Sequence, residues 1–172
     1  TPFLRSGVRY DPVRDFSSIS LIASSPNVLA VGPTLSVKSV SELIALAKAK
    51  PGELNYAAAA TGSANHLAGE LLKSMTGIEI QEIPYRKGVV DAIPDLLAGR
   101  VTMMFSPVPA VLALVRDAKL RALGVTSLKR SAALPNVPTI DESGFPGFQF
   151  PGWYGLFSPE KTPAPIIRRL HL

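Results

Sequence analysis

Residues 39–85 read SVSELIALAKAKPGELNYAAAATGSANHLAGELLKSMTGIEIQEIPY and alternate between helical and extended hydrophobic patterns. Ser39 and Glu42 have the Ser-x-x-Glu form of a capping box, and apolar residues recur after them at helical spacing until Pro51-Gly52. A short strand is predicted next, at 54–57. The stretch therefore begins with a helix followed by a strand.

A second helix is predicted after the small-residue turn 58–63, because apolar residues again recur three and four positions apart. Thr76-Gly77 ends this helix, and residues 78–83 give the next strand. The helix is expected to bury four apolar side chains, those of Leu67, Leu71, Leu72 and Met75.

The same alternation extends in both directions. Upstream, the apolar segment 19–32, broken near Pro26, predicts one or two strands. Repeated helix–strand units are typical of an α/β fold around a mainly parallel sheet. After residue 126, prolines and glycines predict loops around short structure. The further predicted elements are a helix at 89–98, a strand at 101–105, a helix at 110–116, and strands at 120–126 and 153–157, with a final helix from about 165.

The composition is that of a folded protein, since 47% of the 172 residues are hydrophobic and 18% are charged. No apolar stretch reaches the roughly 20 residues of a membrane-spanning helix. Residues 1–5 lack the charged-then-apolar layout of a signal peptide. Because the chain contains no cysteine, disulfides and thiolate chemistry are excluded.

The chain is basic, with a net charge of +5. Its basic residues are spread singly, and only Arg168-Arg169 form a tight pair on a helical pattern, so no nucleic-acid partner is predicted. A mild positive field would instead attract anionic ligands.

No catalytic or metal-binding pattern is present. His66 and His171 are the only histidines and lie far apart, so no His-Glu-x-x-His or Cys/His zinc motif exists. The chain also lacks a Gly-x-Ser-x-Gly elbow, a Walker loop and a dinucleotide-binding glycine motif. We therefore predict no cofactor, no metal site and no enzymatic activity.

The turn 58–63 is the best candidate for a binding site. It places small residues and the hydroxyls of Thr61 and Ser63 between a strand and a helix, where backbone N–H groups lack helical partners and the helix dipole favours an anion. Such a turn can hold a carboxylate. The alternative is that Thr61 or Ser63 simply caps its own helix, and His66 nearby is equally consistent with a structural role.

Two further strand-to-helix turns carry polar residues. Tyr85 with Arg86 and Lys87 suits an anion, although a solvated basic loop explains them as well. Ser106 lies in the third turn. Because ligands gather beyond the carboxyl ends of parallel strands, the three turns are expected to converge on one edge of the sheet.

Short motifs occur along the whole chain in a fixed order: YDPVRDF at 10–16, NY at 55–56, HLAGE at 66–70, PY at 84–85, DLLAGRV at 95–101, KLRAL at 119–123, LPNVPT at 134–139 and WYGL at 153–156. In this order they resemble the motifs of the tripartite tricarboxylate transporter receptors, also called TctC-type or Bug proteins. Several ordered motifs together are far more specific than any single one.

The resemblance implies a periplasmic-binding-protein type II-like α/β fold, with a parallel or mixed sheet, helices on both faces and two lobes. It also implies a periplasmic receptor, exported with a signal peptide in its precursor. Such a receptor would capture a small organic carboxylate (a di- or tricarboxylate, amino acid or related acid) and present it to membrane permease subunits. Together with the turns above, the expected ligand-binding residues are Ala58, Ala59, Ala60, Thr61, Gly62, Ser63, His66, Tyr85 and Ser106.

This chain departs from the family pattern in three places. Ala60 stands where Gly is common, Ser106 stands where Asp is common, and the turn at Arg86-Lys87 is one residue longer than usual. The first change opposes close backbone approach, and the second removes a negative charge and could alter the choice of ligand.

Under this interpretation, residues 33–123 form a nearly complete second lobe. Residues 1–32 and 124–172 are expected to be remnants of the first lobe, with hinge crossings near 24–33 and 123–128. The Gly-rich first-lobe loop of family members has no counterpart here, so we expect a chain truncated at both ends. Exposed strand edges in such a remnant would favour self-association.

Two other functions fit a similar architecture. A ligand-sensing domain of a transcription regulator would be favoured by a helix-turn-helix in the same gene. A small α/β enzyme would be favoured by turnover that depends on Ser63 or His66.

Overall fold

The computed structural model describes residues 7–171. Residues 1–5, considered above as a leader, and residues 1–6 and 172 of the expected first-lobe remnants lie outside the described residues. Contacts divide the chain into two units, Pro26–Pro151 and Thr1–Ser25 with Gly152–Leu172. The larger unit contains the whole range 33–123, and the assignment of these units to lobes stays a prediction.

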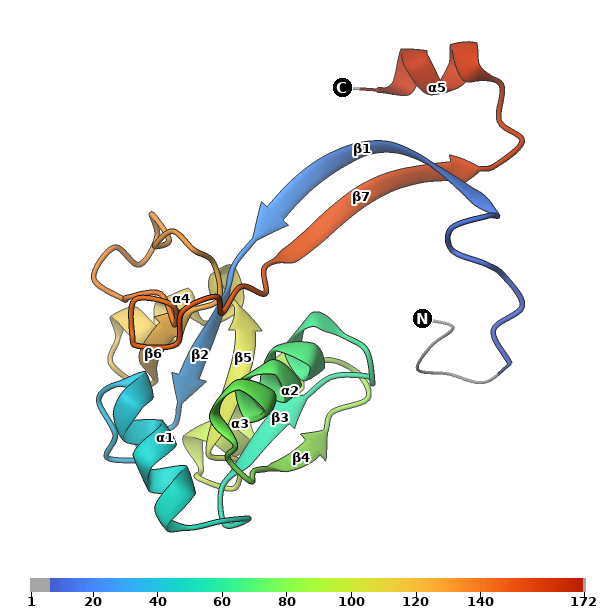
Figure 1. Cartoon of the computed structure of the whole chain (residues 1–172). Coiled ribbons are helices and arrows are strands. Elements are labelled where there is room, and N and C mark those ends of the chain that lie inside the picture. Colours follow the sequence, from blue (N-terminus) through green and yellow to red (C-terminus); the bar gives the residue numbers. More distant parts are fainter. Residues whose placement is uncertain (1–6, 172) are drawn as a thin grey trace. The chain divides into compact units, whose positions relative to one another are not determined.

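The larger unit is built on a five-stranded sheet with the strand order β4-β3-β5-β2-β6 (Figure 1). Strand β3 pairs in parallel with β4 and β5, whereas β2 pairs antiparallel with both β5 and β6. The sheet is therefore mixed, which confirms the predicted α/β class. Its strands are β2 (Asn27–Val31), β3 (Asn55–Ala58), β4 (Gln81–Pro84), β5 (Met103–Pro107) and β6 (Arg121–Val125).

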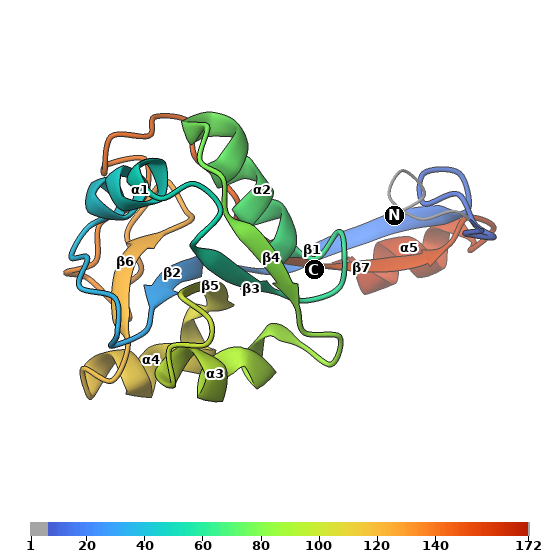
Figure 2. The same cartoon turned by 90° about the horizontal axis from the view of Figure 1, so that it is seen from below.

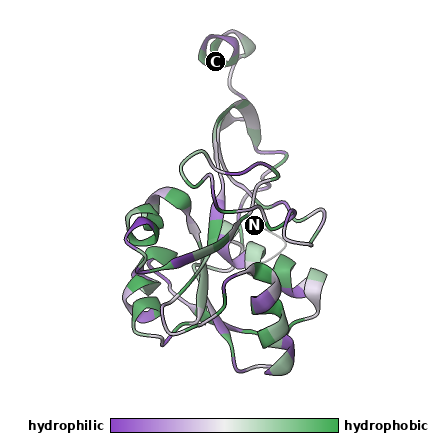
Figure 3. Cartoon of the chain, turned by 90° about the vertical axis from the view of Figure 1, so that its left-hand side faces the viewer, coloured by the Kyte–Doolittle hydropathy of each residue, from purple (hydrophilic) through white to green (hydrophobic). Residues whose placement is uncertain are grey.

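Helices cover both faces of this sheet (Figure 2). Helices α1 (Val40–Ala49) and α2 (Ala64–Thr76) lie on one face, and η1 (Val89–Ala92), α3 (Ile93–Leu97) and α4 (Val108–Arg116) lie on the other. Alternate residues of each buried strand point to opposite faces. Leu29 accordingly joins the α1 and α2 core, and Val28 joins the α3 and α4 core. Figure 3 shows hydrophobic residues (green) recurring along these strands and helices.

The helix ends follow the capping signals in the sequence. The Ser39 hydroxyl oxygen accepts a hydrogen bond from the Glu42 N–H at 3.1 Å, and α1 begins at the next residue, Val40. Helix α2 ends at Gly77, whose left-handed φ of 69° suits glycine. Both helices therefore begin and end close to their predicted bounds.

The buried face of α2 differs from the prediction. Leu72 is buried as expected, but Leu67 and Leu71 are only half-buried and Met75 is 40% exposed. The residues that face the sheet are Ala68, Gly69 and Leu72. The buried ring of Tyr56 lies against Gly69, so small residues are needed along this contact. The prediction that Met75 is buried is therefore wrong.

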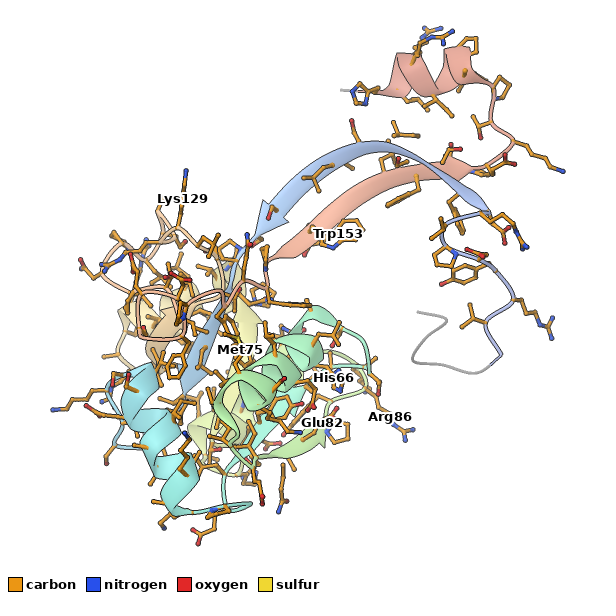
Figure 4. All side chains as sticks on the ribbon, viewed as in Figure 1. His66, Met75, Glu82, Arg86, Lys129 and Trp153 are labelled. Carbon is orange, nitrogen blue, oxygen red and sulfur yellow. The ribbon has the colours of Figure 1, made fainter. Side chains whose placement is uncertain are left out.

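The smaller unit contains β1 (Phe16–Ser25), β7 (Gly152–Pro159) and α5 (Ala164–Leu170). Strands β1 and β7 form a two-stranded antiparallel ribbon with register shifts near residues 18–23 of β1. Trp153, labelled in Figure 4, is 62% exposed on β7. The predicted strand at 153–157 and the predicted final helix are both present.

Residues 126–151 carry no helix or named strand, as the prolines and glycines indicated. Their order comes from local hydrogen bonds. Thr139 and Glu142 cap each other reciprocally, because each side-chain oxygen accepts the other's N–H at 2.9 Å. Within residues 7–171, no helix is long and apolar enough to cross a membrane.

Candidate functional site

The three polar turns lie at the same edge of the five-stranded sheet. Strands β3, β4, β5 and β6 run in one direction and β2 runs in the other, so the carboxyl ends of four strands and the start of β2 meet there. The Tyr85 N–H donates to the Ala58 carbonyl at 2.7 Å, which joins two of these turns directly. The expected convergence of the turns is therefore present.

The turn 58–63 passes from a buried strand end to an exposed loop. Ala58 is buried, Ala59 is half-buried, and Ala60 and Thr61 are exposed. Gly62 has a φ of +84°, in the left-handed region that favours glycine. The Ser63 N–H donates to the Ala60 carbonyl at 2.9 Å and closes the turn.

Ser63 is the N-cap of α2. Its hydroxyl oxygen accepts the His66 N–H at 3.4 Å, so the capping role considered for Thr61 or Ser63 falls to Ser63. Capping leaves other donors at this helix start. The N–H groups of Thr61, Ala64 and Asn65 have no acceptor in the part of the chain that the structure describes. Ala64 and Asn65 belong to the first turn of α2, where the helix dipole is positive.

His66 lies between the turn and β4. Its Nδ1 accepts the Gly62 N–H at 3.4 Å, and its Nε2 lies 3.5 Å from Oε2 of Glu82. The imidazole side chain is 12% exposed. Figure 4 labels His66 on α2 and Glu82 on β4. Both ring nitrogens therefore have protein partners.

A second carboxylate lies further along α2. Oε1 of Glu70 accepts hydrogen bonds from the Tyr56 hydroxyl at 2.9 Å and from Nζ of Lys73 at 2.8 Å. Burial acts to raise the pKa of Glu70, but the hydrogen bonds from Lys73 and Tyr56 outweigh it and hold this pKa below its usual range. Burial and the neighbouring Glu70 raise the pKa of Tyr56 above its ordinary value. This network belongs to the core contact between α2 and β3.

The Tyr85 hydroxyl already has a hydrogen-bond partner within the protein. The hydroxyl donates to Oδ2 of Asp95 at 2.5 Å, and Arg100 pairs with Oδ1 of the same carboxylate. Burial, followed by the contact with Asp95, raises the pKa of Tyr85 to about 12. Arg86 and Lys87 are exposed, as in the alternative of a solvated basic loop.

Ser106 is fully buried near the end of β5 and pairs with Val28 of β2 in the sheet register. Its hydroxyl makes one long contact, 3.5 Å, to the Pro107 carbonyl. The same strand end is fixed from α2, because Nδ2 of Asn65 donates to the Phe105 carbonyl at 2.7 Å. Asn65 thus ties the helix start to the sheet edge.

Asn27 is a polar residue at this edge that sequence reasoning did not single out. It is 3% exposed and begins β2, between the end of β5 and Thr126. Its Nδ2 group is buried and has no hydrogen-bond partner among the described residues. An amide at the start of an apolar strand, in Pro26-Asn27-Val28, was the available signal. A buried donor of this kind is costly unless something accepts from it.

Basic side chains also lie at the opposite edge of the sheet. A surface pocket of about 330 Å³ lies where β6 begins, and Lys119 and Arg121 line it. Arg121 already donates to the Leu35 and Val37 carbonyls. Among residues 7–171, no group of three His, Asp or Glu side chains is placed to hold a metal ion. The carboxyl edge therefore remains the candidate site.

The family model of the tripartite tricarboxylate transporter family receptor (TctC) matches residues 1–172. The chain belongs to this receptor family. Its members are solute-binding proteins. The resemblance that the ordered motifs indicated is thereby confirmed.

Curated relatives agree with this assignment. The chain is 40% identical over 170 residues to the UPF0065 protein in the tcbD-tcbE intergenic region of Pseudomonas sp., covering 98% of this chain and 50% of the relative. It is 40% identical over 164 residues to BugT of Bordetella pertussis, covering 95% of this chain and 50% of the relative. The chain thus spans about half the length of these TctC relatives.

Solved structures of TctC proteins have the same fold. A Rhodopseudomonas palustris protein with adipate is 40% identical, with a TM-score of 0.86 over 97% of this chain and 56% of that chain. MatC of Rhodopseudomonas palustris with bound malate is 30% identical, with a TM-score of 0.85 over 97% of this chain and 56% of that chain. The periplasmic binding protein BugD is 33% identical, with a TM-score of 0.85 over 98% and 56%. The fold shared with the periplasmic binding protein BugD confirms the predicted fold class.

Proposed function

We propose that this chain is part of a periplasmic receptor that captures a small organic carboxylate at the carboxyl edge of its sheet and catalyses no reaction. One observation carries the proposal. At the start of α2, the N–H groups of Thr61, Ala64 and Asn65 lack acceptors among residues 7–171, and the left-handed Gly62 and the N-cap Ser63 fix the turn beside them. Grouped backbone donors at the positive end of a helix dipole suit a carboxylate.

Electrostatics support an anionic ligand. The chain carries a net charge of +5, and Arg86 and Lys87 are exposed on the neighbouring turn at the same edge. Exposed cations contribute mainly by raising the local concentration of anions, because water screens each contact. Backbone donors would then fix the carboxylate, with Thr61 and Ser63 offering hydroxyls nearby.

The buried amide of Asn27 supports a ligand, or a water carried with it, at the same edge. Its Nδ2 donor lacks an acceptor among residues 7–171, and a carboxylate oxygen supplies one. Tyr85 and Ser106 stay in the proposal as residues that shape the edge. The Tyr85 proton is already donated to Asp95, and Ser106 is fully buried.

Two relatives suggest the class of ligand. One was solved with adipate and the other with malate, and both molecules are dicarboxylates. For this chain we propose a di- or tricarboxylate or a related acid, without a cofactor. Residues 33–123 would supply one lobe of the site, lobe closure would enclose the ligand, and the loaded receptor would dock on membrane permease subunits in the periplasm.

The proposal is tested by titrating the ¹⁵N-labelled chain with adipate, malate and the neutral diamide of adipic acid. NMR detects binding even near a dissociation constant of about 1 mM, which corresponds to only about 4 kcal/mol. The largest shifts are expected at the amides of Thr61, Ala64 and Asn65 with the acids and not with the diamide. Equal shifts with the diamide, or shifts confined to another region, would contradict the proposal.

A further inference from the structure

We infer that His66 is a positioning residue whose neutral imidazole holds the turn 58–63 in shape, so that protonation of its Nδ1 releases the turn and weakens anion capture. The part that concerns the ligand rests on the function proposed above. The part that concerns the turn rests on the hydrogen bonds of His66 alone.

His66 occupies the third helical position after the N-cap Ser63. A Glu or Gln is usual there, and its side chain reaches back to the N-cap N–H while the cap accepts its backbone N–H. Here Ser63 accepts the His66 N–H in the usual way, but the imidazole Nδ1 reaches one residue further and accepts the Gly62 N–H. The motif is a capping box with an imidazole acceptor, and its partner is the left-handed glycine of the candidate site.

The partners of the ring fix its tautomer. The Gly62 N–H can only donate, so Nδ1 must carry no proton. The proton of the neutral ring then sits on Nε2, 3.5 Å from Oε2 of Glu82, and a carboxylate can only accept. Both contacts therefore require the same tautomer, the one protonated at Nε2.

Protonation cannot keep both contacts. A proton on Nδ1 would face the Gly62 N–H, which places two donors against each other. It would also add positive charge within the first turn of α2, where the dipole is already positive. The charged ring can keep Glu82 only by turning away from Gly62, and Gly62 then loses its acceptor.

Two carboxylates lie near the His66 ring. Glu82 on β4 faces Nε2 and favours the charged ring, and Glu70 on α2 acts in the same direction at longer range. Glu70 is already paired with Lys73 and with the Tyr56 hydroxyl on β3. Glu82 is therefore the carboxylate that balances a charged His66. The carboxylates stabilise a charged ring, whereas the Gly62 N–H and the helix dipole oppose it.

His171 provides a reference with the opposite tautomer. Its Nδ1 lies 2.6 Å from the Ile19 carbonyl oxygen, which can only accept, so the proton of that ring sits on Nδ1. His66 and His171 are the only histidines of the chain. Their ring nitrogens can therefore be assigned by substituting one of them.

The experiment compares the ¹⁵N-labelled chain with the variants His66→Asn, His66→Gln and His66→Leu between about pH 7.5 and about pH 5.5, the range in which imidazoles titrate. In His66→Asn, the side-chain Oδ1 replaces Nδ1 as an acceptor that does not titrate. The variant His66→Gln is used instead if His66→Asn does not fold. At the higher pH the wild-type ring is expected in the Nε2–H form, with the Gly62 amide proton shifted downfield and protected from exchange. At the lower pH the downfield shift and the exchange protection of the Gly62 amide are expected to disappear in the wild type and to persist in His66→Asn. A ring in the Nδ1–H form, or a Gly62 amide in the wild type that ignores pH, would overturn the inference.

Ligand binding is then measured with adipate at both pH values. The ratio of wild-type to His66→Asn affinity is expected to fall by about fivefold on acidification, the factor for one neutral hydrogen bond. Protonation of adipate changes the affinity of both proteins by the same factor, so it cancels in the ratio. His66→Leu is expected to bind weakly at both pH values. If the turn responds to pH but the chain does not bind adipate, the role of His66 in the turn is supported. The same result would count against the proposed function. Adipate binding with no change in the ratio would contradict the role in capture.

Discussion

Gly69 of α2 lies directly against the ring of Tyr56 of β3, since a Cβ atom on Gly69 would lie 2.3 Å from Cε2 of the tyrosine. Tyr56 is fully buried, and its hydroxyl continues past this contact to Glu70. The contact brings the helix close to the sheet and so positions the N-terminal end of α2 over the carboxyl edge of β3.

Gly69→Ala is expected to lower the free energy of unfolding by about 1–3 kcal/mol, because the added methyl group overpacks the core. Helix propensity alone predicts the opposite, a gain of about 1 kcal/mol. Urea unfolding followed by circular dichroism measures the difference. In the Tyr56→Leu background the same substitution is expected to cost much less, and additive costs would show that the ring is not the cause.

Ala118→Gly is expected to raise the free energy of unfolding by about 0.5–1 kcal/mol. Ala118 follows α4 and has a φ of 55°, the one positive value among the non-glycine residues that the structure describes. A left-handed backbone costs an L-residue about 1–2 kcal/mol, part of which the greater freedom of glycine in the unfolded chain cancels. The matched control is Ala113→Gly, exposed within α4, which should lose about 1 kcal/mol. Destabilisation by both variants would contradict the expected relief of strain.

Asp95→Asn is expected to lower the melting temperature at neutral pH and to have little effect in strong acid. Hydrogen bonds from the Tyr85 hydroxyl and from Arg100 hold the pKa of Asp95 below its usual range. A carboxyl group whose pKa is lower in the folded state stabilises the protein above its unfolded pKa of about 3.9, and this contribution is lost as the pH falls through the folded pKa.

Melting curves of both proteins at about pH 7 and about pH 2.5, on either side of that unfolded pKa, give the comparison. Asp91→Asn is the control, because Asp91 is exposed on η1 and its carboxylate has no hydrogen bond among the described residues. An equal difference between Asp95→Asn and the wild type at both pH values would show that the carboxylate charge is not involved.

Local patterns predicted the elements of the fold well. The period of apolar residues and the caps at Ser39 and Gly77 are short-range signals, so α1 and α2 begin and end near their predicted bounds. The three polar turns reached one edge because strands joined by helices run in the same direction.

Long-range pairing could not be predicted in the same way. The place of β2 between β5 and β6 depends on contacts such as Asn27 with Thr126, 99 positions apart. Burial of Met75 was mispredicted because helical spacing does not show which positions of the helix the sheet covers, and the buried positions here are Ala68, Gly69 and Leu72. The partner of the Tyr85 hydroxyl lies on α3, so the sequence alone left that phenol as a free donor.

The ribbon of β1 and β7 is expected to promote self-association of the chain. A two-stranded ribbon is marginally stable by itself, and Leu21 is 68% exposed and Trp153 62% exposed on it. Light scattering should therefore show a mass that rises with concentration. Leu21→Lys is expected to reduce this rise, whereas Val13→Lys, at a residue 86% exposed outside the ribbon, should not. A monomer at all concentrations would contradict the expectation.

Gly62→Val tests whether the turn 58–63 contributes to anion binding. Gly62 has a φ of +84° and donates its N–H to His66, so a β-branched side chain strains the backbone and displaces neighbouring donors. The dissociation constant for adipate is expected to rise by more than about fivefold, or about 1 kcal/mol, the order of one lost hydrogen bond to a charged group. Gly52→Val is the matched control, because Gly52 also has a positive φ, +73°, but precedes β3 at the opposite edge of the sheet. Both variants should lose stability, and only Gly62→Val should lose affinity. Equal adipate affinities in folded forms of the two variants would remove the turn from the binding site.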